Sequence, residues 1–146
     1  MAPGPAHPNE PEPAHPNETV EVLSAVTLAT ADMPASVKFY ESLGFVRRYG
    51  GASGRERGGG AQEAFTSFHA GAGYLNLQLD SSWQAPARVW GRAIFWVRDV
   101  DAVHSRAVAA GLHPHAEPAD APWGERYFHI TDPSGHEISL ARPLRS

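Results

Sequence analysis

Residues 32–45 read DMPASVKFYESLGF, and residues 99–112 read DVDAVHSRAVAAGL. In both stretches an Asp is placed to cap the first turn of a helix, and a Gly stands where that helix should end. Pro34 suits a first helical turn, because the N–H group that it lacks has no helical partner at that position. The two Asp residues are 67 positions apart, and so are the two Gly residues, which indicates an internal duplication.

Short runs rich in β-branched and aromatic residues surround both expected helices. In the first half these runs predict strands at residues 22–30, 45–49, 63–69 and 74–80. In the second half they predict strands at residues 92–97, 112–117, 125–131 and 136–141. Each half therefore has the order β-α-β-β-β, and the expected fold class is α+β with two tandem modules. We expect module one at residues 22–80, a linker at 81–91 and module two at 92–143, within a single domain of residues 22–146.

The first 21 residues differ from the rest in composition. They hold six of the 13 prolines and repeat the sequence PAHPNE at residues 5–10 and 13–18, which predicts a disordered, proline-rich tail. They also hold four Glu and no Lys or Arg, so the formal charge of −4 belongs to the tail and the remaining body is neutral. A neutral body gives no reason to expect a nucleic acid or a membrane surface as a partner.

Three absences in the sequence narrow the function further. The chain has no Cys, which excludes disulfides, thiolate zinc sites and a Cys nucleophile. No apolar run approaches the roughly 20 residues that a membrane-spanning helix needs. The N-terminus also lacks the basic start and apolar stretch of a signal peptide, so a cytoplasmic protein is expected.

The duplicated pattern resembles the vicinal oxygen chelate superfamily, which includes glyoxalase I, extradiol dioxygenases and bleomycin resistance proteins. The motifs that carry the resemblance are residues 32–45, 99–103, 122–128 and 132–136, and it covers residues 22–143. It implies two curved modules whose strands wrap a central cavity, commonly in a homodimer. Because this superfamily hosts many chemistries, the fold alone does not fix the function.

The resemblance also implies four strand positions at which the enzymes of the family hold a divalent metal ion. Those positions are occupied here by Ala25, Arg92, Asn76 and Ser139. Ala has no donor atom, Arg is a cation, and neutral Asn and Ser are poor ligands. We therefore expect no metal and no other cofactor, which makes the chain most similar to the metal-free antibiotic-binding members of the superfamily.

Strand alternation predicts which side chains line the cavity, since successive residues of a strand point to opposite faces. The ligand-binding residues expected on this basis are Arg92, Trp96, Asn76, Gln78, Ser139 and Glu137, joined by Trp123 and His129. Hydrogen-bonding groups beside aromatic rings suit a small molecule held by polar contacts and stacking. Two other histidines, His104 and His115, are expected to face solvent.

Several of these residues have an alternative, purely structural interpretation. In that interpretation Arg92 simply forms an ion pair with Glu137 across the cavity. Trp96 then packs in the core, and Trp123 anchors a loop. His129 is either a group that contacts the ligand or a hydrogen-bonded strand histidine.

Two classes of function follow from this set of residues. The first is a metal-independent binding protein that sequesters an antibiotic or a toxic metabolite, holds an aromatic ligand in the cavity and has no catalytic residues. The alternative is a glyoxalase-like lyase or isomerase, or a dioxygenase-type enzyme, with an atypical or absent metal site and His129 or Glu137 as general base. A regulatory or scaffold protein with an empty cavity is a third interpretation. Arg92 at the centre of a neutral body favours a neutral or anionic aromatic ligand.

Overall fold

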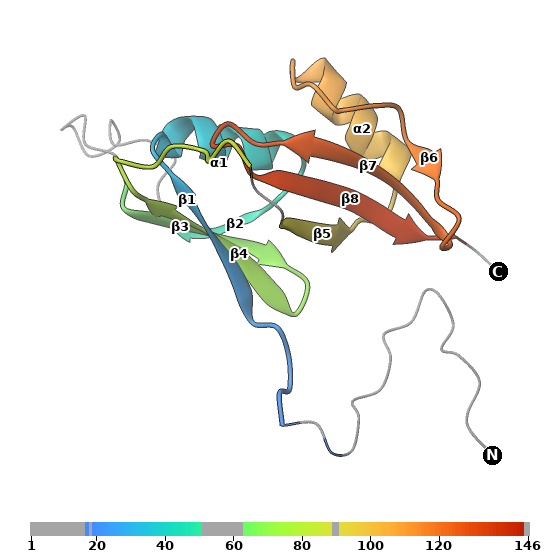
Figure 1. Ribbon diagram of the computed structural model, residues 1–146, viewed down its shortest axis with the longest axis horizontal. Helices are drawn as coiled ribbons and strands as arrows, with labels where there is room; N and C mark the ends of the chain where they lie inside the picture. The colour runs from blue at the N-terminus through green and yellow to red at the C-terminus, as the bar shows by residue number, and fades with distance from the viewer. Residues whose placement is uncertain (1–16, 18, 51–62, 89–90, 145–146) are drawn as a thin grey trace.

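The computed structural model describes residues 17, 19–50, 63–88 and 91–144 (Figure 1). Module one contains β1 (Ala25–Thr30), α1 (Met33–Ser42), β2 (Arg47–Gly50), β3 (Phe65–Ala70) and β4 (Gly73–Leu79). Module two contains β5 (Arg92–Trp96), α2 (Val100–Ala109), β6 (Ala119–Asp120), β7 (Glu125–Thr131) and β8 (Glu137–Pro143). The two helices are 67 positions apart, as the duplication predicts.

Each module forms its own four-stranded sheet. The strand orders are β1-β4-β3-β2 and β5-β8-β7-β6. In both sheets the first strand runs parallel to the last, while the other neighbours are antiparallel. Figure 1 shows the two sheets side by side, with both helices toward the same side of the molecule. The predicted α+β fold with two β-α-β-β-β modules is confirmed.

The residues that begin and end the two helices act as the sequence indicates. Asp32 and Asp99 each accept a hydrogen bond from the backbone N–H three residues further on, at 3.1 and 3.0 Å. Gly44 and Gly111 follow the helices with φ of 103° and 82°. This left-handed conformation strains a residue that has a Cβ, so glycine permits the sharp turn into the next segment.

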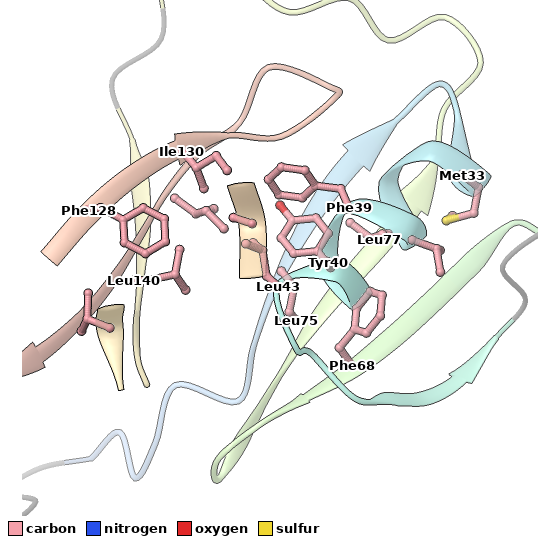
Figure 2. Packing of buried hydrophobic residues seen from close by; sticks show 14 residues of the cluster. Met33, Phe39, Tyr40, Leu43, Phe68, Leu75, Leu77, Phe128, Ile130 and Leu140 are labelled. Carbon is pink, nitrogen blue, oxygen red and sulfur yellow. The ribbon is translucent and has the colours of Figure 1, made fainter. Parts of the chain in front are cut away.

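One hydrophobic core joins the two modules (Figure 2). Its buried side chains come from both helices and both sheets: Met33, Val37, Phe39, Tyr40, Leu43, Phe68, Leu75, Leu77, Val100, Ala107, Phe128, Ile130, Ile138 and Leu140. At the module boundary the rings of Phe45 and Phe95 meet edge to face, with centroids 5.0 Å apart. Tyr40 donates its hydroxyl to Asp132 Oδ2 at 2.6 Å across the same boundary. Burial raises the pKa of Tyr40, and the Asp132 carboxylate raises it further, so the hydroxyl stays protonated as a donor.

The prediction of a strand at residues 112–117 is wrong. These residues are irregular, and the two-residue strand β6 follows them. Pro114 and Pro118 lack the N–H group that a sheet ladder needs, which interrupts pairing along this stretch. β1 begins at Ala25, three residues later than expected, and the bounds of the other strands agree within two residues.

The prediction that His104 faces solvent is also wrong, because α2 directs its side chain toward the core. His104 is only 8% exposed, and its ring lies edge-on to that of Phe128, with centroids 5.1 Å apart. The predicted tail of residues 1–21 falls almost entirely outside the described residues. Within the described ranges, no helix is long and apolar enough to cross a membrane.

Candidate functional site

Six of the eight predicted ligand-binding residues lie on or beside the face of the second sheet that α2 leaves uncovered. Cross-strand pairing places Arg92 beside Glu137, and it places Ser139 beside His129. Ile94 and Trp96 are 57% and 54% exposed there, while the alternating residues Ala93 and Phe95 pack toward the core. In Figure 1, α2 lies on one side of the second sheet, and we call the other side of this sheet the open face. The strand register gives its residues, which are Arg92, Ile94, Trp96, Glu125, Tyr127, His129, Thr131, Glu137, Ser139, Ala141 and Pro143.

A single carboxylate holds two tryptophans at one end of the open face. Trp96 Nε1 donates to one oxygen of Glu125 at 2.9 Å, and Trp123 Nε1 donates to the other at 3.0 Å. Trp123 also lies against the ring of Tyr127, with centroids 5.8 Å apart and planes inclined by 33°. Trp123 is 68% exposed, so both indoles are fixed through their N–H edges while much of their ring surface meets solvent. We call these four residues the aromatic end.

An ion pair lies at the other end of the open face. Arg92 donates to Glu137 Oε2 from Nη2 at 2.8 Å and from Nε at 3.1 Å. These hydrogen bonds hold the pKa of Glu137 below its usual range. The structural pairing that the sequence left open for Arg92 is therefore present, and the two charges compensate each other. We call this pair, with the neighbouring His115, the charged end.

His129 lies between the two ends. Its Nδ1 is hydrogen-bonded to Ser139 Oγ at 2.5 Å, and its ring centroid is 4.9 Å from that of Tyr127. Ser139 is buried, so this bond fixes the orientation of the imidazole. Partial burial lowers the pKa of His129, and the positive charge of Arg92 lowers it further. The ring is therefore neutral at pH 7 and offers one donor and one acceptor.

His115 is exposed, as expected, and it also belongs to the same polar network. Its Nε2 is hydrogen-bonded to Thr131 Oγ1 at 2.8 Å, and its Nδ1 lies 3.7 Å from Glu137 Oε1. Its backbone N–H donates to the carbonyl of His129 at 2.9 Å. The irregular stretch before β6 thus brings a second histidine, beside His129, to the open face.

The two remaining predicted residues, Asn76 and Gln78, lie on the first sheet. Asn76 accepts a hydrogen bond from Ser67 Oγ at 2.8 Å and donates to Thr27 Oγ1 at 3.3 Å. Gln78 donates to the backbone carbonyl of Ala64 at 3.3 Å. In the part of the chain that the structure describes, neither side chain contacts the open face. A single chain therefore does not bring all eight predicted residues together.

A cavity of about 680 Å³ lies at the junction of the two modules. Its walls come from the α1–β2 connection, the β3–β4 turn, β5 and α2, and Trp96 is the one predicted residue among those that line it. This volume suits a small ligand. The oriented polar and aromatic groups are concentrated on the adjoining open face, which makes that face the stronger candidate site.

The residues at the four family metal positions do not fit a divalent cation. Ala25 and Asn76 lie on the first sheet, whereas Arg92 and Ser139 lie on the second and are bonded to Glu137 and His129. Among the described residues, no group of three or more His, Asp or Glu side chains is arranged to hold a metal. What this surface offers a ligand is hydrogen bonds, charge and aromatic rings.

Three residues of this surface are not among the predicted ligand-binding residues: Glu125, Tyr127 and His115. Alternation along β7 could have found the first two, since they precede His129 by four and two residues and so share its face. His115 has no such signal, because its position depends on the irregular path of residues 112–118.

Several solved structures share this fold. TioX from Micromonospora sp. ML1 is 23% identical with a TM-score of 0.64, over 85% of this chain and 100% of that one. Lactoylglutathione lyase from Agrobacterium tumefaciens is 20% identical with a TM-score of 0.62, over 85% and 95% of the two chains. A bleomycin-binding protein in complex with bleomycin is 18% identical with a TM-score of 0.61, over 84% and 98%. At these identities the likeness shows the fold alone.

Sequence relatives and a family model complete the comparison. Uncharacterised proteins from Mycobacterium bovis and Mycobacterium tuberculosis are each 45% identical over 49 residues, or 34% of this chain. The matching segment spans only 32% and 29% of their lengths. The glyoxalase family model matches much more, residues 22–140. This match covers both β-α-β-β-β modules, and the chain belongs to the Glyoxalase/Bleomycin resistance protein/Dioxygenase superfamily.

Proposed function

We propose that this chain is a small-molecule binding protein that holds an aromatic ligand on its open face. In this proposal it sequesters an antibiotic or a toxic metabolite and needs no metal ion. The observation that carries the proposal is the pair of exposed indoles, Trp96 and Trp123, held by Glu125. Exposed aromatic surface of this kind is typical of binding sites, and a fixed orientation lowers the entropy that binding costs.

The rest of the open face supports a ligand with polar groups as well as rings. His129 has a fixed orientation and one ring nitrogen beyond its bond to Ser139, and Arg92 and Glu137 present hydrogen-bonding groups at the charged end. A bleomycin-binding protein with the same fold lends support to the antibiotic as a ligand class.

We propose further that the protein works as a homodimer. Asn76 and Gln78 belong to the predicted site but lie on the first sheet, away from the open face of the same chain. A second copy could supply them to the ligand. Light scattering after size exclusion should then give a mass near twice 15.7 kDa, and a monomer at micromolar concentration would contradict this part.

Calorimetric titration with a panel of planar aromatic compounds tests the binding proposal. Trp96→Ala and Trp123→Ala should each lower the affinity for a bound compound by about tenfold, the typical effect of truncating an aromatic anchor. Trp83→Phe is the matched control, because Trp83 stacks on His136 and donates to the Ser134 carbonyl, away from the open face. Unchanged affinity in both alanine variants would rule out stacking on these indoles.

The same titration tests independence from metal ions. Protein treated with EDTA should bind as tightly as untreated protein. A divalent metal found at one equivalent per chain, whose removal abolishes binding, would contradict the proposal.

One observation favours the enzyme alternative. His129 is held by Ser139 with its pKa lowered by burial, and a neutral, oriented imidazole is suited to act as a general base. Recovery of the bound compound after incubation separates the two functions. A binding protein returns it unchanged, whereas an enzyme returns a product.

A further inference from the structure

The carboxylate of Glu125 lies between two neutral donors at the aromatic end of the open face. Both of its oxygens accept hydrogen bonds from indole N–H groups, which are neutral donors. Within the described ranges, no Arg, Lys or His side chain is bonded to it. Its bonds to the two indoles therefore fix its position without compensating its charge.

The guanidinium of Arg92 at the other end of the face does not cancel this charge. Arg92 is bonded to Glu137 through two of its nitrogens. Along β8, the backbone partner of Arg92 is Glu137 and that of Glu125 is Pro143, six residues further on. At about 3.3 Å per residue this separation is about 20 Å. It exceeds the screening length of about 8 Å at physiological ionic strength.

The aromatic rings around Glu125 also attract a positively charged group. A cation over the face of a Trp or Tyr ring is attracted by the negative π surface, and Trp attracts it most strongly. The indole N–H edges of Trp96 and Trp123 are already committed to Glu125, so the surfaces left for a ligand are the ring faces. Tyr127 contributes a third ring beside Trp123.

We infer that the cluster of Trp96, Trp123, Tyr127 and Glu125 selects a planar ligand that carries a positive charge on or next to its ring system. This inference rests on the proposed function and names the ligand class for the same face. It replaces the expectation of a neutral or anionic ligand. That expectation rests on Arg92, and the structure pairs Arg92 with Glu137.

Two tricyclic probes of equal size and opposite charge test the inference. 9-Aminoacridine is a planar cation at pH 7, and anthracene-9-carboxylate is a planar anion. The affinity of the full chain for each is measured by titration calorimetry at fixed ionic strength. The expected result is that the cation binds at least tenfold more tightly than the anion.

Glu125→Gln removes the charge and keeps one of the two acceptor oxygens, so it retains a hydrogen bond to one indole and loses the acceptor of the other. The loss of that bond affects both probes, whereas the loss of the charge weakens the binding of the cation alone. This variant should therefore lose about tenfold more affinity for 9-aminoacridine than for anthracene-9-carboxylate. Glu41→Gln is the matched control. It removes the same charge from α1, where Glu41 is bonded to Arg47, and should leave both affinities unchanged.

The outcomes distinguish this inference from the proposed function. Equal affinity for the two probes, or a cation preference that survives in Glu125→Gln, overturns the inference and leaves aromatic binding intact. A loss of cation affinity in Glu41→Gln equal to that in Glu125→Gln also overturns it, because the effect would then come from net charge. Binding of neither probe overturns the inference and the proposed function together.

Discussion

At the residue scale, Arg92 and Glu137 define the charged end through two short hydrogen bonds between facing side chains of neighbouring strands. The pKa of Glu137 is lowered chiefly by the hydrogen bond from Arg92. A lowered carboxyl pKa means that the folded state holds the proton less tightly than the unfolded state. The resulting stabilisation is present above the usual Glu range and is lost as the pH falls through it.

Arg92→Gln should therefore raise the pKa of Glu137 toward its ordinary value, because it removes the charged donor. Carboxyl chemical shifts followed by NMR across acid pH would measure this. The control is Arg47→Gln, which breaks the Arg47–Glu41 pair in module one and should leave Glu137 unchanged. A Glu137 titration that does not move in Arg92→Gln would show that the ion pair does not form in solution.

Residues of the site differ in how far the sequence could identify them. Alternation placed Arg92, Glu137 and Ser139 on one face, because residue spacing along a strand fixes the face whatever the partner strand is. The hydrogen bonds from Trp96 and Trp123 to Glu125 could not be predicted from the sequence. They depend on strand register and on the reach of two side chains, one of them 29 positions away in sequence.

At the element scale, the helices were predictable because their signals are local. Asp99 accepts a hydrogen bond from the Ala102 N–H, and Gly111 takes the left-handed conformation after α2. Both features act within a few residues of the helix ends. The prediction of a strand at residues 112–117 was wrong because Pro114 and Pro118 remove backbone hydrogen-bond donors. Alternation of apolar residues does not reveal that loss.

Asp99→Ala should lower the free energy of unfolding by about 1 kcal/mol, since it removes the side-chain acceptor at the N-terminus of α2. Denaturant unfolding monitored by circular dichroism would measure the change. Asp99→Asn should retain most of the stability, because the amide oxygen can accept the same bond. An Ala variant as stable as the native chain would mean that this cap contributes nothing.

At the scale of the whole molecule, the two modules share one core and are linked by directed contacts. Tyr40 on α1 donates to Asp132 after β7, and His136 in the same turn lies 2.8 Å from the Ala29 carbonyl of β1. These contacts hold the second sheet in a fixed relation to module one. The duplication predicted two modules, but nothing in the spacing of one sequence predicted these pairings. They join residues more than 90 positions apart.

This arrangement leaves the aromatic end of the open face exposed while the opposite face of the sheet packs into the core. Trp83, by contrast, stacks on His136 with ring centroids 5.2 Å apart and links residues 81–88 to the β7–β8 turn. The four tryptophans of the chain therefore include two at the proposed site and one that is structural.

The most direct test of aromatic binding on the open face is the response of the individual indole N–H signals to a ligand. In ¹H–¹⁵N NMR spectra of the chain titrated with 9-aminoacridine, the Nε1–H signals of Trp96 and Trp123 should shift together and saturably. Assignment comes from Trp96→Phe and Trp123→Phe. The signal of Trp83 should stay in place. A shift of Trp83 without Trp96 and Trp123 would contradict the account, and so would a spectrum that no planar aromatic compound changes.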